Sequence, residues 1–256
     1  MIGRHGGLLY HFVVCPPLPL KRKKIKMKFA LASDLHLEFD TLELNNTEGA
    51  DELTFLDITA TVDDRKTLFD LVERIASQID IPFTVGGGIR SVEDARDVIQ
   101  AGADKISVNS AAVKRPQLIT EIADSFGSQC VVVAIDAAAI ENKWEVFIQG
   151  GRLSAGIQVQ DWVEEVQWRG AGEILLTSMD HDGAKKGFAT ELINVLSPHL
   201  RVPLIASGGA GKKEDFTDLF IQTSASAALA ASVFHFDEIK ISDLKKHLKY
   251  LNIPIR

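Results

Sequence analysis

The acidic residue best placed to do chemistry in this sequence is Asp136. It follows an unbroken apolar run, residues 131–135, which is typical of a strand buried on both faces. A carboxylate at the carboxyl end of such a strand lies where parallel barrels carry their catalytic groups. An ordinary turn aspartate is the alternative for an isolated example. The residues that accompany Asp136 therefore decide between the two interpretations.

Two glycine-rich turns predict binding sites for phosphate. The turns are residues 86–88 and 207–209, and each follows a predicted strand and precedes a predicted helix. Small residues there let backbone amides approach an anion closely. Two residues at or just after the end of the next strand complete each site. The resulting sets are Gly88, Asn109 and Ser110 for the first phosphate site, and Gly209, Ala231 and Ser232 for the second.

The placement of these two sites indicates the kind of substrate. Parallel barrels commonly bind phosphate after strands seven and eight, and an internal repeat then predicts an equivalent site after strands three and four. Two sites that face each other across one mouth imply a substrate with a phosphate at each end. Ordinary turns rich in glycine and serine would explain either site alone, but not their symmetric placement.

The elements that must position these residues alternate along the chain from residue 49. Short apolar runs are separated by segments with helical periodicity, which predicts βα units and a parallel sheet. Residues 49–52 and 81–88 each have a counterpart 121 residues later, which indicates two half-barrels. We therefore predict a (β/α)8 TIM barrel with an atypical, truncated first βα unit. The predicted strands are residues 53–58, 82–85, 105–108, 131–135, 173–177, 204–206 and 227–231, with 28–33 as the eighth.

Composition limits the other possibilities. The 256 residues carry a net charge of −7, which argues against a general nucleic-acid binder. The early apolar stretch at residues 8–14 is too short to span a membrane. The two cysteines, Cys15 and Cys130, have neither disulfide nor metal-ligand spacing, which suits a reducing cytoplasm. We expect residues 1–26 to be a disordered extension and residues 27–256 to form one barrel domain.

Residues 27–39 resemble the opening strand of calcineurin-like metallophosphoesterases. The resemblance rests on Asp34 and His36, which match two metal ligands of that family. Two ligands cannot hold a dinuclear metal centre, and the later ligand motifs of the family are not found in the chain. The sequence therefore predicts no metal site.

Residues 49–256 closely resemble the cyclase subunit of imidazole glycerol phosphate synthase, a lyase of histidine biosynthesis. The stretches that carry the resemblance are residues 49–60, 84–90, 102–109, 131–136, 205–211 and 228–235. The resemblance implies that ammonia from a separate glutaminase subunit is added to a doubly phosphorylated formimino ribonucleotide. Imidazole glycerol phosphate and aminoimidazole carboxamide ribonucleotide are then the products. No cofactor is implied.

The resemblance also implies roles for single residues. Asp136 matches one of the two catalytic aspartates of the family, a position suited to general acid-base work. The residues of the two predicted phosphate sites match phosphate-binding positions of the family. The resemblance adds Asp182 and Gly183 to the second site. Asp57 and Thr177 match positions at the barrel mouth. Charged residues match the rim at the opposite end of the barrel, where the family admits ammonia: Glu52, Lys105 and Glu173.

The opening of the chain departs from the family. The family begins with a strand that ends in its other catalytic aspartate, followed by a flexible loop, and neither is recognisable here. Asp34 is the candidate that could replace this aspartate, although the unit that follows it is shortened. Two hypotheses follow: an active cyclase that uses Asp34, or a catalytically impaired barrel that binds phosphosugars.

Overall fold

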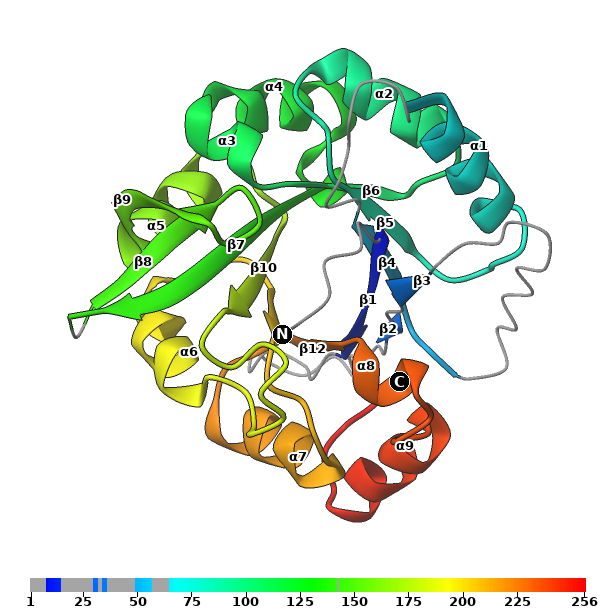
Figure 1. The fold of residues 1–256 in the computed structure, drawn as a ribbon, viewed down its shortest axis with the longest axis vertical. Coiled ribbons are helices and arrows are strands. Elements are labelled where there is room, and N and C mark those ends of the chain that lie inside the picture. Colours follow the sequence, from blue (N-terminus) through cyan, green and yellow to red (C-terminus); the bar gives the residue numbers. More distant parts are fainter. Residues whose placement is uncertain (1–7, 15–29, 32–33, 36–48, 57–64, 142) are drawn as a thin grey trace.

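The fold is a closed barrel of eight strands surrounded by helices (Figure 1). The computed structural model describes residues 8–14, 30–31, 34–35, 49–56, 65–141 and 143–256. Around the barrel the strand order is β10-β11-β12-β1-β4-β5-β6-β7, and β7 pairs with β10 to close the ring. These strands are β1 (Leu8–Val14), β4 (Leu53–Leu56), β5 (Phe83–Gly86), β6 (Lys105–Val108), β7 (Val131–Ile140), β10 (Glu173–Ser178), β11 (Leu204–Ser207) and β12 (Ala227–Ala230).

Seven of the eight strands run parallel, as the sequence predicted, and the (β/α)8 barrel is confirmed. The helices connect successive strands and cover the outside of the barrel. They are α1 (Arg65–Ala76), α2 (Val92–Gln100), α3 (Ser110–Lys114), α4 (Gln117–Phe126), α5 (Val159–Trp168), α6 (Thr190–Leu196), α7 (Lys213–Gln222), α8 (Ser232–His235) and α9 (Ile241–Tyr250), with 3-10 turns at Ser128–Cys130 and Ser197–His199.

The eighth position in the barrel differs from our expectation. The strand between β12 and β4 is β1, which is antiparallel to both. Of the predicted eighth strand, residues 28–33, the structure describes Ala30–Leu31, which pair in parallel with β12. The prediction that residues 1–26 lack regular structure is therefore wrong for Leu8–Val14. This apolar run completes the backbone ladders that an open barrel would leave unpaired on two edges. Two short strands also belong to this sheet. β2 (Ala30–Leu31) pairs with β12, and β3 (Asp34–Leu35) pairs with β1.

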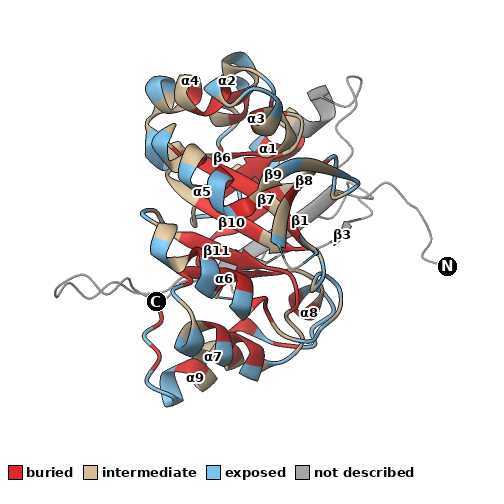
Figure 2. Cartoon of the chain, turned by 90° about the vertical axis from the view of Figure 1, so that its left-hand side faces the viewer, coloured by how far each residue is buried: buried red, intermediate tan, exposed pale blue. Residues whose placement is uncertain are grey.

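Side-chain burial follows the layers of the barrel (Figure 2). Ile106, Ile135 and Ile174 lie on neighbouring strands and are fully buried. On α5, the apolar residues that share one face at helical spacing are buried: Val159, Trp162, Val163 and Val166. Because these apolar residues pack the barrel and its helices together, the polar residues at the strand ends are held on rigid elements.

Asp136 is not the end of its strand. β7 continues beyond it to Ile140 and pairs in antiparallel fashion with β8 (Lys143–Ile148), which pairs in turn with β9 (Leu153–Gln158). On one edge, the pairing of β7 with β6 stops at Val133 and the pairing with β8 begins at Asp136, whereas on the other edge β7 stays paired with β10 as far as Ala137. Sequence reasoning missed this hairpin because the run Ala137-Ala138-Ala139 carries no clear strand signal.

Candidate active site

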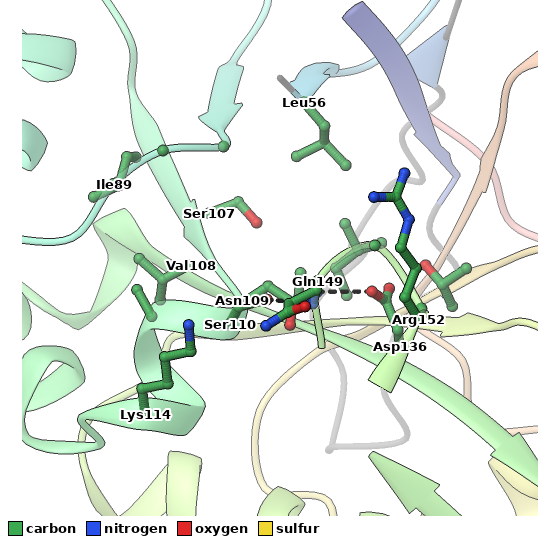
Figure 3. A pocket seen from close by; sticks show the side chains of 18 of the residues that line it. Leu56, Ile89, Ser107, Val108, Asn109, Ser110, Lys114, Asp136, Gln149 and Arg152 are labelled. Carbon is green, nitrogen blue, oxygen red and sulfur yellow. Dashed lines mark hydrogen bonds between the residues drawn. The ribbon is translucent and has the colours of Figure 1, made fainter. Parts of the chain in front are cut away.

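A cavity of about 870 Å3 opens at the carboxyl ends of the parallel strands (Figure 3). Its lining comes from β4, β6, β7 and β10 and from the loops that follow β5, β6, β8 and β10. This is the end at which parallel barrels carry active sites. Six of the predicted site residues line it: Gly88, Asn109, Ser110, Asp136, Thr177 and Asp182.

The carboxylate of Asp136 has an unusual environment. Burial, opposed by a hydrogen bond from Asn109 and assisted by the nearby charge of Asp182, raises the pKa of Asp136 to about 6. Nδ2 of Asn109 donates that bond to Oδ2 of Asp136 at 3.0 Å. A carboxyl group with a pKa near 6 is present in both protonation states close to neutral pH, which suits it to general acid-base catalysis.

Asn109 is turned toward the cavity and not toward the helix that follows it. It stands at the N-cap position of α3, yet its side chain makes no capping hydrogen bond. Its Oδ1 atom is buried and has no hydrogen-bond partner in the part of the chain that the structure describes. Because buried polar atoms are normally paired, this oxygen is available to a donor on a bound ligand.

The three residues predicted to bind the first phosphate come together in the lining of the cavity. Gly88 adopts a positive φ of 72° in the turn after β5, and Asn109 and Ser110 follow β6. The hydroxyl of Ser110 accepts a hydrogen bond of 2.9 Å from the backbone N–H of Gln149, in the turn between β8 and β9. The hairpin that the sequence did not predict is therefore fixed against this site.

The second phosphate site is only partly joined to the described cavity. Within the described residues, Asp182 is the member of that set that lines it. Gly209 pairs with the loop after β10, since its carbonyl accepts a hydrogen bond of 2.9 Å from the N–H of Gly187. A Cβ atom on Gly209 would collide with the Gly187 carbonyl, and the φ of Gly209 is 105°. Gly183 belongs to the same loop, and Ala231 and Ser232 begin α8 after β12.

Three charged residues gather at the opposite rim of the barrel, where the strands begin. Nζ of Lys105 lies 2.7 Å from Oε1 of Glu173 and also contacts Glu52. This cluster is buried, since the side chains of Lys105 and Glu52 are only 11% and 2% exposed. Burial alone would lower the pKa of Lys105, but the charges of Glu52 and Glu173 outweigh it and raise the pKa to about 12.

Asp57 lies outside the described residues. The backbone of Asp34 is described in β3, where it stands opposite Leu9 of β1, and Leu9 stands opposite Leu56 of β4. Because Leu56 lines the cavity, this register places Asp34 at the mouth end of the barrel.

Neither a membrane span nor a metal centre is indicated by the described residues. No helix in that part of the chain has the length and apolar composition needed to cross a membrane. Within the same residues, no three His, Cys, Asp or Glu side chains are grouped so that they could hold a metal ion. His36, on which the metallophosphoesterase resemblance partly rests, lies outside the described residues.

The fold and the site define a (β/α)8 barrel whose polar groups converge at the carboxyl ends of its strands. Residues 32–240 match the family described as "Histidine biosynthesis protein", and the chain belongs to this family. It is 51% identical over 246 residues to "Imidazole glycerol phosphate synthase subunit HisF" of Natranaerobius thermophilus, covering 95% of this chain and 98% of the relative. A protein of the same name from Flavobacterium psychrophilum is 58% identical over 209 residues, covering 82% of this chain and 83% of the relative. Another from Thermotoga sp. strain RQ2 is 57% identical over 208 residues, covering 81% of this chain and 82% of the relative.

Proposed function

We propose that this chain is the cyclase subunit of imidazole glycerol phosphate synthase and acts as a lyase in histidine biosynthesis. Family membership and identities of 51% to 58% over most of the chain support this assignment. The alternative, a barrel that binds phosphosugars without turnover, is not favoured by this similarity.

The observation that carries the mechanism is the buried carboxyl group of Asp136 in the mouth cavity. Ring closure and cleavage require that protons be removed from some atoms and added to others. With its pKa near 6, Asp136 can remove a proton in one step and return it in a later one at neutral pH. Asn109 holds the carboxylate in one orientation, and the free Oδ1 of Asn109 can accept a hydrogen bond from the substrate.

The substrate that we propose is a formimino ribonucleotide with a phosphate at each end. Gly88, Asn109 and Ser110 would bind one phosphate through the turn after β5 and the start of α3. The other phosphate would be bound by the loop after β10 and the turns after β11 and β12, where the relevant residues are Asp182, Gly183, Gly209, Ala231 and Ser232. Thr177 pairs with Asp136 across β10 and β7, which supports a role for Thr177 beside the reacting part of the substrate.

The partner that we propose is a glutaminase that docks where the strands begin. Exposed apolar side chains occur toward the carboxyl ends of three helices, at that end of the barrel: Trp168, Ile221 and Tyr250 are 78%, 66% and 85% exposed. Exposed apolar groups of this size are typical of interaction surfaces. Lys105 and its two glutamates would then control the entry of ammonia into the barrel axis.

We place the protein in the cytoplasm, without a nucleic-acid partner.

A turnover assay with the ribonucleotide and free ammonium salts tests this function without the glutaminase. The expected result is the formation of imidazole glycerol phosphate and aminoimidazole carboxamide ribonucleotide in equal amounts. Binding of both products without any turnover would favour the impaired barrel instead. Supplying glutamine and a glutaminase from a relative then tests the partnership separately.

A further inference from the structure

The turn between β8 and β9 reaches over the mouth of the barrel and is held there from two sides. On one side, the N–H of Gln149 donates a hydrogen bond of 2.9 Å to the hydroxyl of Ser110. On the other, Gly151 packs so closely on Met179 that a Cβ atom would collide with the end of that side chain. Within the turn, the N–H of Arg152 donates to the carbonyl of Ile148 at 3.1 Å. The position of Arg152 is therefore defined by contacts to two different loops.

The side chain of Arg152 lines the same cavity as Asp136 (Figure 3). In this view Arg152 and Asp136 lie on one side of the cavity, and Lys114 lies on the other. The guanidinium group of Arg152 makes no hydrogen bond or ion pair with the residues that the structure describes. Arg115, which also lines the cavity, is instead engaged by Glu121 at 2.8 Å.

The charges around the cavity show what Arg152 could bind. The residues of the first phosphate site, Gly88, Asn109 and Ser110, are all uncharged, and the cavity is also lined by the carboxylates of Asp136 and Asp182. A phosphate monoester carries a charge of about −1.5 to −2 at pH 7. These two carboxylates disfavour a further negative charge, and the cations that line the cavity besides Arg152 are Arg90, Lys114 and Arg115. A guanidinium group offers paired N–H donors that match the oxygens of a phosphate.

We propose that Arg152 is a substrate-binding residue that donates its guanidinium N–H groups to a phosphate of the ligand in the mouth cavity. This proposal rests on the proposed function, because it assigns Arg152 to the phosphorylated substrate of that reaction. It adds a cation to two proposed phosphate sites whose other named residues carry no positive charge. The function of the hairpin of β8 and β9 would then be to position this cation at the barrel mouth.

Calorimetric titration of the full chain with three probes tests the proposal: inorganic phosphate, imidazole glycerol phosphate and aminoimidazole carboxamide ribonucleotide. Each product retains one phosphate of the substrate, so the two products distinguish the ends of the ligand. We expect Arg152→Met to weaken the binding of phosphate and of one product by about tenfold, as for the loss of one charge-assisted hydrogen bond. Arg152→Lys should recover part of this loss, because it keeps the charge without the paired geometry.

Lys143→Met is the matched control, because Lys143 is an exposed cation at the other end of β8, outside the cavity. The control should change each affinity by less than about twofold, since an exposed charge at this distance is screened. Unchanged affinities in Arg152→Met, an equal loss in the control, or no binding of any probe by the unmodified chain would overturn the proposal. If phosphate binding depends on Arg152 but the unmodified chain does not turn over the ribonucleotide, Arg152 is supported and the proposed function is contradicted.

Discussion

Nδ2 of Asn109 donates a hydrogen bond of 3.0 Å to Oδ2 of Asp136, and this bond joins two neighbouring strands of the barrel at its mouth. The bond favours the ionised carboxylate, whereas burial and the charge of Asp182 favour the protonated acid. The pKa of about 6 is the balance of these effects. It keeps Asp136 able to exchange protons near neutral pH.

Asn109→Ala should shift the pH dependence of turnover. Without the hydrogen bond, the pKa of Asp136 should rise above its present value of about 6. The acidic limb of the ammonium-dependent rate should therefore move to higher pH. Because the fraction of free ammonia also changes with pH, the rate must be measured at a constant concentration of free ammonia. The control is Asn194→Ala, on the exposed side of α6. If the acidic limb lies at the same pH in the wild type and in both variants, the hydrogen bond from Asn109 does not set the pKa of Asp136.

Asp136→Asn should stabilise the fold at neutral pH. The pKa of Asp136 is about 6 in the folded chain, against 3.8 as the ordinary value. Between these two pH values the folded state binds more protons than the unfolded state, so stability falls as pH rises. Above pH 6 this costs about 1 to 3 kcal/mol, which the neutral amide avoids while it still accepts the bond from Asn109.

Urea unfolding of the wild type and of Asp136→Asn measures this difference at two pH values. The variant should unfold at higher urea concentration at pH 7.5, and the difference should shrink toward pH 4. A variant that is less stable than the wild type at pH 7.5 would show that the carboxylate is not destabilising.

Gly209→Ala should damage the second phosphate site far more than Gly183→Ala does. Both glycines have a positive φ, 105° at Gly209 and 69° at Gly183. A Cβ atom at Gly183 would meet nothing within 4 Å, whereas one at Gly209 would collide with the carbonyl of Gly187. We expect Gly183→Ala to cost about 1 kcal/mol of unfolding free energy, from the left-handed backbone alone. Gly209→Ala should cost more and should also weaken phosphate binding, and equal losses by thermal unfolding would contradict the observed contact.

Lys105→Ala should separate the use of glutamine from the use of ammonium. The variant leaves the buried Glu52 and the nearby Glu173 without their shared cation, so a loss of about 3 kcal/mol in stability is expected. If the cluster controls the entry of ammonia, the ratio of glutamine-dependent to ammonium-dependent rates should change as well.

Lys245→Ala is the control for that experiment, because Lys245 forms the other buried ion pair near the strand starts, at 3.0 Å from Asp51. It should lower stability without changing the ratio of the two rates. If Lys105→Ala also leaves that ratio unchanged, the residue has a structural role only.

The sequence predicted the parts of the fold that rest on local patterns. Strands such as β6 and β11 are short apolar runs between turns. The helix after Ser91 begins with a capping residue of the usual kind, since the Ser91 side chain accepts a hydrogen bond from the N–H of Asp94. These signals are local, so they can be recognised without knowledge of the tertiary structure.

The features that the sequence did not predict depend on contacts between distant segments. Nothing local in Leu8–Val14 shows that it pairs with β12 and β4, because that pairing depends on the gap left by the rest of the barrel. The burial of Lys105 likewise depends on the convergence of β4, β6 and β10 at one rim. Arg152 was missed because it lies in the hairpin of β8 and β9, which no apolar periodicity in the sequence predicted.

The most direct test of the account is the ammonium-dependent turnover of Asp136→Asn compared with that of the wild type. We expect the variant to lose at least about a hundredfold in kcat, which is typical of the loss of a general acid-base group. Its affinity for both phosphorylated products should stay within about twofold of the wild type, since the amide occupies the same position. Turnover by Asp136→Asn at a rate close to that of the wild type would contradict the central role of this carboxyl group.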